Sequence, residues 1–251
     1  MVCGRYLKTL TLPTGTVTPP EQVLVPGGRD VRASLDAGSA AVGTDAERAG
    51  ADGGDDGRTD AGNVGDAGDA TDGSAGAGRI VVACPPHPRM GGSRSDSRLV
   101  AASDVLGERG IDCLRVDYGD WDEGRGEQRD VGNALAWAGE RYDAVGLFGF
   151  SFGATMALCV AAGRDDLSGT SALAPDRGRE GADAVVALSG IECPVQVLHG
   201  ARDDTADWEP IVERARESGH TVEALPADHF FVGQQQKVAE RVGTFFERAF
   251  G

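Results

Sequence analysis

Residues 144–162 have the sequence AVGLFGFSFGATMALCVAA, and this stretch decides the fold. Its first seven residues are apolar and predict a buried strand, and the Ala-rich run from Ser151 onward predicts an apolar helix. At the junction, Gly149-Phe150-Ser151-Phe152-Gly153 matches the pattern Gly-x-Ser-x-Gly. Between a strand and a helix this pattern predicts a sharp turn that exposes the serine hydroxyl as a nucleophile. The alternative is a Gly-rich turn in which Ser151 only caps the helix.

Strands and helices alternate on both sides of this turn. Runs of 10–15 residues with helical periodicity separate short apolar runs, which predicts a mostly parallel α/β sheet with helices on both faces. Ligands bind such sheets at the carboxyl ends of the strands. The expected strands are 21–25, 30–35, 79–84, 112–117, 144–150, 167–173, 194–199 and 221–225. The expected helices are 99–109, 127–141, 151–162, 179–187, 208–217 and 234–249.

Composition divides the chain into four parts. Residues 1–20 form an expected loose tail, and residues 21–36 add two N-terminal strands around Pro26-Gly27-Gly28. Residues 37–78 contain 12 Gly, 11 Ala and 8 Asp with almost no large apolar residue, which predicts a disordered acidic loop. A calcium-binding Gly/Asp repeat is the alternative, although its regularly spaced large apolar residue is missing. Residues 79–251 form the expected catalytic core.

The charge of the chain excludes some classes of partner. Its 24 Lys and Arg residues, only two of them lysines, face 40 Asp and Glu residues, which gives a net charge of -16. Such a chain repels phosphate backbones, so we expect no nucleic-acid partner. Many carboxylates with few lysines also favour a halophilic protein, because salt screens the self-repulsion of the surface. Ordinary acidity in a GC-rich genome is the alternative.

Two absences concern location. No run approaches the roughly 18–20 apolar residues that span a membrane, and the first residues lack the apolar segment of a secretory signal. The cysteines are scattered and form no Cys-x-x-Cys pair, so we expect buried thiols in a reducing cytoplasm rather than disulfides or a zinc site. They are Cys3, Cys84, Cys113, Cys159 and Cys193.

A serine nucleophile needs a base and an acid that orients it. His229 follows the last expected strand, and Asp203, with Asp204 beside it, follows the strand before that one. Both positions lie at the carboxyl edge, so we predict a triad of Ser151, Asp203 and His229. The other histidines fit less well, since His220 is expected to be exposed and His199 to be structural.

The oxyanion needs two N–H donors. Phe152, directly after the nucleophile, is the first expected donor. The second is expected from the loop after strand 79–84, where the prolines have no N–H, which leaves Arg89 first and His87 second. His87, Tyr118 and Trp121 are also expected to border the substrate.

The stretch 163–194 already holds a strand, a helix and their connections. It therefore leaves no residues for a large cap domain over the site. An open, shallow site buries little of a long chain, which predicts a preference for short acyl groups.

From residue 79 to 249 the chain resembles the α/β-hydrolase superfamily, in its dienelactone hydrolase-like and small serine esterase branches. The resemblance rests on several motifs in order, namely Pro86-His87-Pro88 with Gly91-Gly92, Arg115-Val116-Asp117-Tyr118-Gly119, Gly124-Arg125-Gly126-Glu127, Gly149-Phe150-Ser151-Phe152-Gly153, His199-Gly200-Ala201-Arg202-Asp203 and Ala227-Asp228-His229-Phe230-Phe231. It implies a Ser-His-Asp hydrolase without metal or organic cofactor. Dienelactone hydrolases typically carry a cysteine nucleophile, and the usual His-Gly oxyanion motif is His87-Pro88 here.

The sequence therefore predicts a serine hydrolase that cleaves a small ester-like substrate, a carboxylester or a lactone, through an acyl-enzyme. The same triad also serves acyltransferases, thioesterases and peptidases, and a non-catalytic binding protein of this fold is a further alternative.

Overall fold

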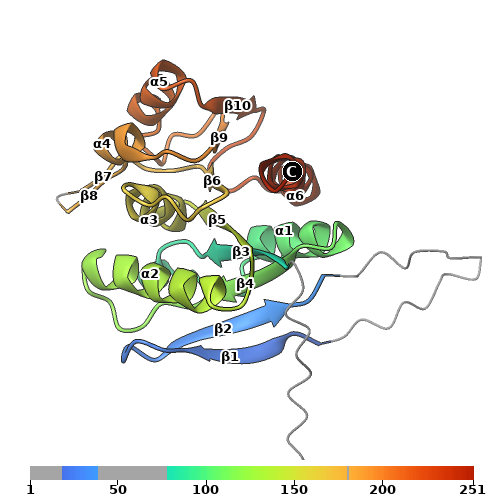
Figure 1. The fold of residues 1–251 in the computed structure, drawn as a ribbon. Helices are drawn as coiled ribbons and strands as arrows, with labels where there is room; N and C mark the ends of the chain where they lie inside the picture. The colour runs from blue at the N-terminus through green and yellow to red at the C-terminus, as the bar shows by residue number, and fades with distance from the viewer. Residues whose placement is uncertain (1–18, 39–77, 180) are drawn as a thin grey trace, which may run out of the picture.

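A computed structural model describes residues 19–38, 78–179 and 181–251 of the chain (Figure 1). The predictions for the N-terminal tail up to residue 18 and for the acidic loop over 39–77 lie outside these residues. The described residues form an eight-stranded sheet in the order β1-β2-β4-β3-β5-β6-β9-β10. Strands β1 and β2 form an antiparallel hairpin, β2 runs antiparallel to β4, and every later pairing is parallel.

The strands lie close to their predicted positions. The bounds are β1 Glu21–Val25, β2 Val31–Asp36, β3 Arg79–Cys84, β4 Asp112–Val116, β5 Ala144–Phe150, β6 Gly169–Leu173, β9 Val195–Gly200 and β10 Thr221–Leu225. In β3, β5, β6 and β9 nearly every residue is buried. This explains their continuous apolar runs, because a central parallel strand is covered on both faces.

Helices cover both faces of the sheet, as predicted (Figure 1). On one side lie α1 (Ser97–Glu108) and α6 (Gln235–Ala249), which pack against each other. The other side carries α2 (Arg125–Gly139), α3 (Phe152–Ala161), α4 (Ala184–Ala187) and α5 (Glu209–Glu217). The apolar core is divided accordingly. In β3, Ile80 and Val82 pack toward the α2–α5 face, whereas Val81 and Ala83 pack toward α1 and α6.

The predicted helix over 179–187 is wrong in its first half. A small hairpin, β7 (Gly178–Arg179) and β8 (Ala182–Asp183), occupies that part, and only the four-residue α4 and the short 3₁₀ helix η2 (Leu188–Gly190) follow. Gly178 and Gly181 have φ values of 93° and 87°, which a right-handed helix does not tolerate. Together with short connections, these elements fill the whole interval between β6 and β9, so no cap domain is inserted there.

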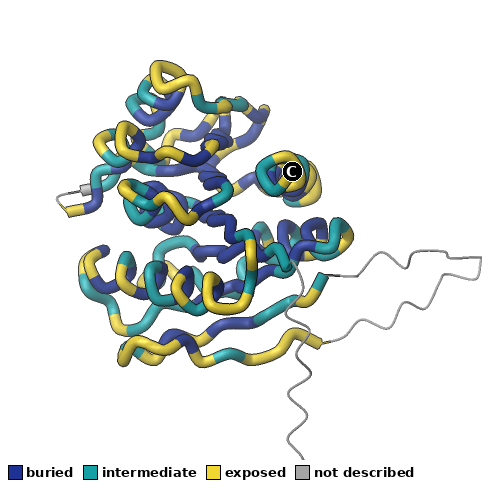
Figure 2. The backbone as a smooth tube through the Cα atoms, viewed as in Figure 1, coloured by how far each residue is buried: buried dark blue, intermediate teal, exposed yellow. Residues whose placement is uncertain are grey.

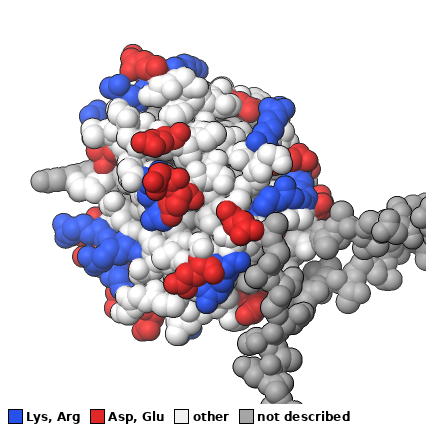
Figure 3. Space-filling view, in the orientation of Figure 1, with Lys and Arg blue, Asp and Glu red and all other residues white. Residues whose placement is uncertain are grey.

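Burial follows the layers, with dark blue segments in the sheet and yellow ones on the outer sides of the helices (Figure 2). On the face shown in Figure 3, acidic and basic side chains are interspersed. No helix in the described part of the chain is both long and apolar enough to cross a membrane.

Candidate active site

The turn between β5 and α3 has the strained backbone of a nucleophile elbow. Ser151 has φ 56° and ψ −120°, a backbone conformation that residues other than glycine rarely adopt. Its N–H donates to the Leu173 carbonyl on β6 at 2.8 Å, which fixes the turn to the sheet. The Ser151 side chain makes no capping hydrogen bond to α3. The simple capping role therefore does not describe this serine.

Both glycines of the motif are required by close packing. A Cβ on Gly149 would lie 2.2 Å from the Gly153 carbonyl oxygen. A Cβ on Gly153 would lie 2.3 Å from the Cys84 oxygen and 2.4 Å from that of Pro85. These contacts press the start of α3 against the end of β3, which brings Ser151 and the loop after β3 to the same edge of the sheet.

The three predicted triad residues are in hydrogen-bond contact. Ser151 Oγ lies 2.9 Å from His229 Nε2, and His229 Nδ1 lies 2.7 Å from Asp203 Oδ2. With its Nδ1–H donated to the carboxylate, the imidazole keeps Nε2 as the acceptor for the serine hydroxyl. The Asp203 side chain is fully buried and that of His229 is 8% exposed. Asp204, the neighbouring alternative, is exposed and makes no contact with the imidazole in this arrangement.

The loop after β9 holds the acid in place. Asp203 Oδ1 accepts the N–H groups of Thr205 at 2.9 Å and Ala206 at 3.1 Å, which leaves Oδ2 for the imidazole. The Trp208 indole N–H donates to the Asp203 carbonyl at 2.9 Å. At the end of the strand, a Cβ on Gly200 would lie 2.6 Å from the Ala227 oxygen. The acid loop, residues 201–208 with Asp203, and the histidine loop, residues 226–234 with His229, therefore start side by side.

The two predicted sources of oxyanion donors also meet at this edge. Phe152 is the first residue of α3, where N–H groups have no intrahelical acceptor. The loop after β3 continues into the 3₁₀ helix η1 (Pro88–Met90), in which the Arg89 N–H donates to His87 Nδ1 at 3.2 Å. The Arg89 N–H must leave that bond before it can bind an oxyanion, and the choice between Arg89 and His87 as the second donor stays a prediction.

An aromatic cluster forms one wall beside Phe152. The Phe152 ring lies 4.9 Å from that of His87, 5.7 Å from Tyr118 and 5.6 Å from Trp121, measured between centroids. His87 and Trp121 are themselves 4.5 Å apart. All three residues predicted to border the substrate are thus gathered beside the residue after the nucleophile.

Tyr118 also makes a hydrogen bond to the loop after β3. Its hydroxyl donates to the Pro85 carbonyl at 3.2 Å. Burial raises the pKa of the Tyr118 phenol well above its usual value, so the phenol stays neutral.

Two histidines stay outside the triad. His199 is buried at the end of β9 and stacks on Trp208 with 4.2 Å between ring centroids, which agrees with the predicted structural role. His220 is half-buried rather than exposed as predicted. It lies just after α5, where its backbone N–H donates to the Ala215 carbonyl.

Three of the thiols in the described part of the chain are poor nucleophiles. Burial raises the pKa of Cys113 and of Cys159 to about 12, and that of Cys84 further still, so these thiols remain protonated at neutral pH. In the described residues no group of three or more His, Cys, Asp and Glu side chains is arranged to hold a metal ion.

Sequence reasoning missed two parts of the site. The guanidinium of Arg98 lies 4.4 Å from the centroid of Phe150 and donates to the Phe230 carbonyl at 3.1 Å, which attaches the histidine loop to α1. Asp176, after β6, accepts an N–H from the acid loop. Neither residue stands in a motif, and only the tertiary arrangement makes them visible.

No protein-family model and no curated protein sequence matches the chain significantly. Solved structures do match it. An α/β serine hydrolase homologue from Coxiella burnetii is 20% identical, with 92% of this chain and 99% of that chain covered at a TM-score of 0.66. An α/β serine hydrolase without lid from Xanthomonas campestris is 21% identical, with 92% and 95% covered at 0.67.

A third match is Est1E from Butyrivibrio proteoclasticus. It is 15% identical, with 92% of this chain and 99% of that chain covered at a TM-score of 0.69. The mostly parallel sheet, the helices on both faces and these three matches agree with the architecture expected from the sequence. The chain has the α/β-hydrolase fold.

Proposed function

We propose that the protein is a serine hydrolase that cleaves a small ester-like substrate. The observation that carries the proposal is the continuous chain from Asp203 Oδ2 to His229 and from His229 Nε2 to Ser151 Oγ, at 2.7 and 2.9 Å, on a strained elbow. A serine hydroxyl is a weak nucleophile alone, and this arrangement supplies both the base and the group that orients it.

The proposed reaction passes through an acyl-enzyme. Ser151 Oγ attacks the carbonyl carbon while its proton moves to His229 Nε2, and Asp203 stabilises the resulting imidazolium. The Phe152 N–H and a donor from the loop after β3 hold the oxyanion. As the tetrahedral intermediate collapses, the carbon–oxygen bond to the alcohol breaks and His229 gives its proton to the leaving oxygen. Water then attacks the acyl-enzyme by the same route and releases the acid.

A fluorophosphonate probe tests the nucleophile directly. We expect the probe to label the wild-type protein at Ser151, and we expect Ser151→Ala to abolish labelling and to reduce hydrolysis of an activated ester by several orders of magnitude. Ser218→Ala, at an exposed serine after α5, is the matched control and should behave like wild type. A folded Ser151→Ala variant that retained more than about a tenth of the wild-type rate would refute the assignment.

The substrate class follows from the shape of the surroundings. Between β6 and β9 there is no inserted cap, and the wall beside Phe152 consists of side chains from short loops. The esterase names among the similar structures, and a form of Est1E with ferulic acid bound, support small esters as the starting point.

An open wall of this kind buries only a short acyl group, and each CH₂ left in water forgoes about 0.8 kcal/mol. In a nitrophenyl ester series we therefore expect kcat/KM to be highest at about two to six acyl carbons. A maximum at about twelve carbons or beyond would show an apolar tunnel instead.

A further inference from the structure

The acid loop, residues 201–208, carries Asp203 and has two anchors. At its start, the N–H groups of Ala201 and Arg202 donate to the Leu225 and Ala227 carbonyls at 2.7 and 3.0 Å. These bonds continue the pairing of β9 with β10. Asp203 lies beyond them, so they fix the beginning of the loop but not its far side.

The second anchor is the side chain of Asp176, in the connection after β6. Its Oδ2 accepts the Asp207 N–H at 3.0 Å, and its Oδ1 accepts the Gly178 N–H at 2.8 Å. In return the Arg177 N–H donates to the Asp207 carbonyl at 3.1 Å. Residue 207 is thereby held from both its N–H and its C=O, directly before Trp208, whose indole holds the Asp203 carbonyl.

Asp176 is itself fixed to the helix that starts at the nucleophile. Thr155, one turn into α3, is buried, and its hydroxyl donates to the Asp176 carbonyl at 2.8 Å. The same hydroxyl accepts the Asp176 N–H at 3.2 Å. In the first turn of that helix, the Thr155 N–H donates to the Ser151 carbonyl at 3.1 Å.

We propose that Asp176 is a positioning residue that ties the acid loop to the nucleophile helix. Resting on the proposed function, it links Ser151 through Thr155, Asp176 and Asp207 to the loop of Asp203, on a route separate from His229. Ser151 and the loop of Asp203 are then connected twice, once through the His229 side chain and once through these supporting hydrogen bonds. Asp176 touches no reacting atom.

The physical need for such a tie follows from the geometry of the acid. Asp203 is buried, but it stands in the connection between β9 and α5 and not on a strand, and its Oδ2 has to meet the imidazole within hydrogen-bond distance. A displacement of about 1 Å at a reacting group costs up to about a hundredfold in rate. Loss of the Asp176 carboxylate removes the acceptor of the Asp207 N–H, so the part of the acid loop around Asp207 can move.

The test compares two carboxylates in the same segment. Asp176 and Asp183 each accept two backbone N–H groups, but those bound by Asp183 belong to Val185 and Val186 at the start of α4 and not to the acid loop. The Asp183 carboxylate also lies 4.0 Å from the guanidinium of Arg177. We expect Asp176→Ala to lower kcat for a nitrophenyl ester about tenfold to a hundredfold, with KM changed less than about twofold. We expect Asp183→Ala to stay within about twofold of wild type in both constants.

A double-mutant cycle separates positioning from general loosening. In an Asp203→Ala background the acid is gone, so Asp176→Ala should change the residual rate less than about twofold. Thr155→Val keeps the shape of the side chain and removes both bonds to the Asp176 backbone, and we expect it to lower kcat severalfold. If Asp176→Ala does not fold, the Thr155→Val variant tests the positioning role in its place.

Each result has a defined meaning. A wild-type rate in Asp176→Ala, or in Thr155→Val where Asp176→Ala does not fold, overturns the positioning role, as does an equal loss with and without Asp203. In these cases the proposed function stands as long as Ser151 is labelled by the fluorophosphonate. An unlabelled wild-type protein overturns the proposed function, and the positioning role with it.

Discussion

The two ends of the sheet each carry a carboxylate hydrogen-bonded to a ring side chain, but only the pair at the carboxyl end is extended by a contact to a third side chain. At the carboxyl end Asp203 Oδ2 lies 2.7 Å from His229, and at the amino end Asp112 Oδ2 lies 2.6 Å from the Tyr142 hydroxyl. The imidazole has a second nitrogen that passes the contact on to Ser151. The phenol has no second polar atom, so the chain of contacts ends there.

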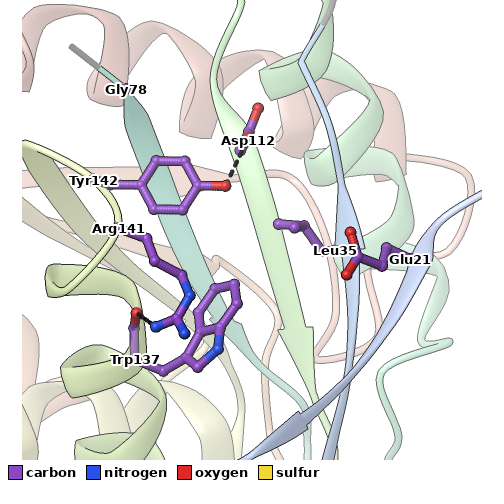
Figure 4. Close-up of a pocket in the computed structure, with 7 residues that line it drawn as sticks. All are labelled: Glu21, Leu35, Gly78, Asp112, Trp137, Arg141 and Tyr142. Atoms are coloured by element: carbon purple, nitrogen blue, oxygen red, sulfur yellow. Dashed lines mark hydrogen bonds between the residues drawn. The ribbon is translucent and has the colours of Figure 1, made fainter. Parts of the chain in front are cut away.

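A hollow also opens at the amino end. A cavity of about 430 Å³ opens beside Tyr142 and is lined by Glu21, Leu35, Gly78, Asp112, Trp137, Arg141 and Tyr142 (Figure 4). Two hydrogen bonds join residues of its lining, from the Tyr142 hydroxyl to Asp112 and from the Arg141 guanidinium to the Trp137 carbonyl at 2.9 Å. The other oxygen of Asp112 accepts the Gly38 N–H at 2.7 Å, and the guanidinium of Arg141 lies 4.5 Å from the Trp137 ring centroid.

The difference shows what makes a carboxylate–ring pair reactive. Burial and the bond to Asp112 raise the pKa of Tyr142 above its usual value, so this phenol stays neutral and serves structure. At the other end a strained backbone presents a hydroxyl to the free nitrogen of the ring. The two ends therefore differ in the third polar group and in the backbone that presents it.

The largest effect should come from breaking the pair at the carboxyl end. Asp203→Asn keeps the volume of the side chain but no longer favours the imidazole tautomer that accepts from Ser151, so we expect kcat to fall by about 10³–10⁴-fold. Asp204→Asn, at the exposed neighbour, should leave the rate within about twofold. Steady-state kinetics on an activated ester measures both.

The reverse result would move the assignment of the acid. If Asp204→Asn reduced the rate by orders of magnitude while Asp203→Asn left it intact, the loop would have to rearrange in solution so that Asp204 reaches His229. Retained fluorophosphonate labelling in either variant would show that the nucleophile itself is still in place.

Local patterns were sufficient to predict most of the elements and to select three residues that lie in hydrogen-bond contact. The apolar run of β5, the glycines around Ser151 and the order Ser151, Asp203, His229 are each visible in the sequence, and the hydrogen bonds agree with them. The parallel sheet followed from the alternation of strands and helices. These features depend on residues close together in the chain or on rules of chain order.

What sequence reasoning missed depends on distant contacts. The Asp112–Tyr142 bond joins residues 30 positions apart, and the Asp176–Asp207 bond joins residues 31 positions apart. Neither Asp112, at the start of β4, nor Asp176, in the connection after β6, has a local sequence signature of its role. The hairpin at 178–183, where a helix was predicted, is a different case. Gly178 and Gly181 are a turn signal in the sequence, but the helical pattern of the residues that follow obscured it.

A smaller effect is expected at the amino end. Tyr142→Phe removes the hydroxyl and leaves Asp112 Oδ2 without that donor, so we expect the free energy of unfolding to fall by about 1 kcal/mol. The site is far from Ser151 along the strands, so kcat/KM should not change. Urea denaturation measures the first quantity and ester hydrolysis the second.

An unequal outcome would alter the comparison. If Tyr142→Phe lowered kcat/KM tenfold without a loss of stability, the amino end would contribute to function and the contrast drawn here would fail. Trp137→Phe, on the same cavity, is a suitable companion variant because it keeps an aromatic ring beside Arg141.

The smallest expected effect concerns His199, at the carboxyl end of β9. Unlike His229, its imidazole makes no hydrogen bond to a carboxylate or to a hydroxyl of the described residues. Both its nitrogens are buried and lack hydrogen-bond partners among the described residues. Burial lowers the pKa of His199 below its usual value. The Gly200 backbone opposes this most strongly, Arg216 lowers the pKa by a smaller amount, and Asp203 and Glu209 raise it least.

Because the pKa of His199 is lower in the folded state, the unfolded state binds more protons in the window below about pH 6.5. The contribution of His199 to stability is therefore complete above that pH and is lost as the pH falls toward the folded pKa. His199→Phe keeps a ring on Trp208 and removes the titration, so the difference in unfolding free energy between pH 8 and pH 5 should be smaller in this variant. His220, whose pKa is also lowered by burial, keeps its own share of the pH dependence. Chemical denaturation at both pH values measures the difference, and an unchanged pH dependence would show that His199 finds a proton acceptor when it is charged.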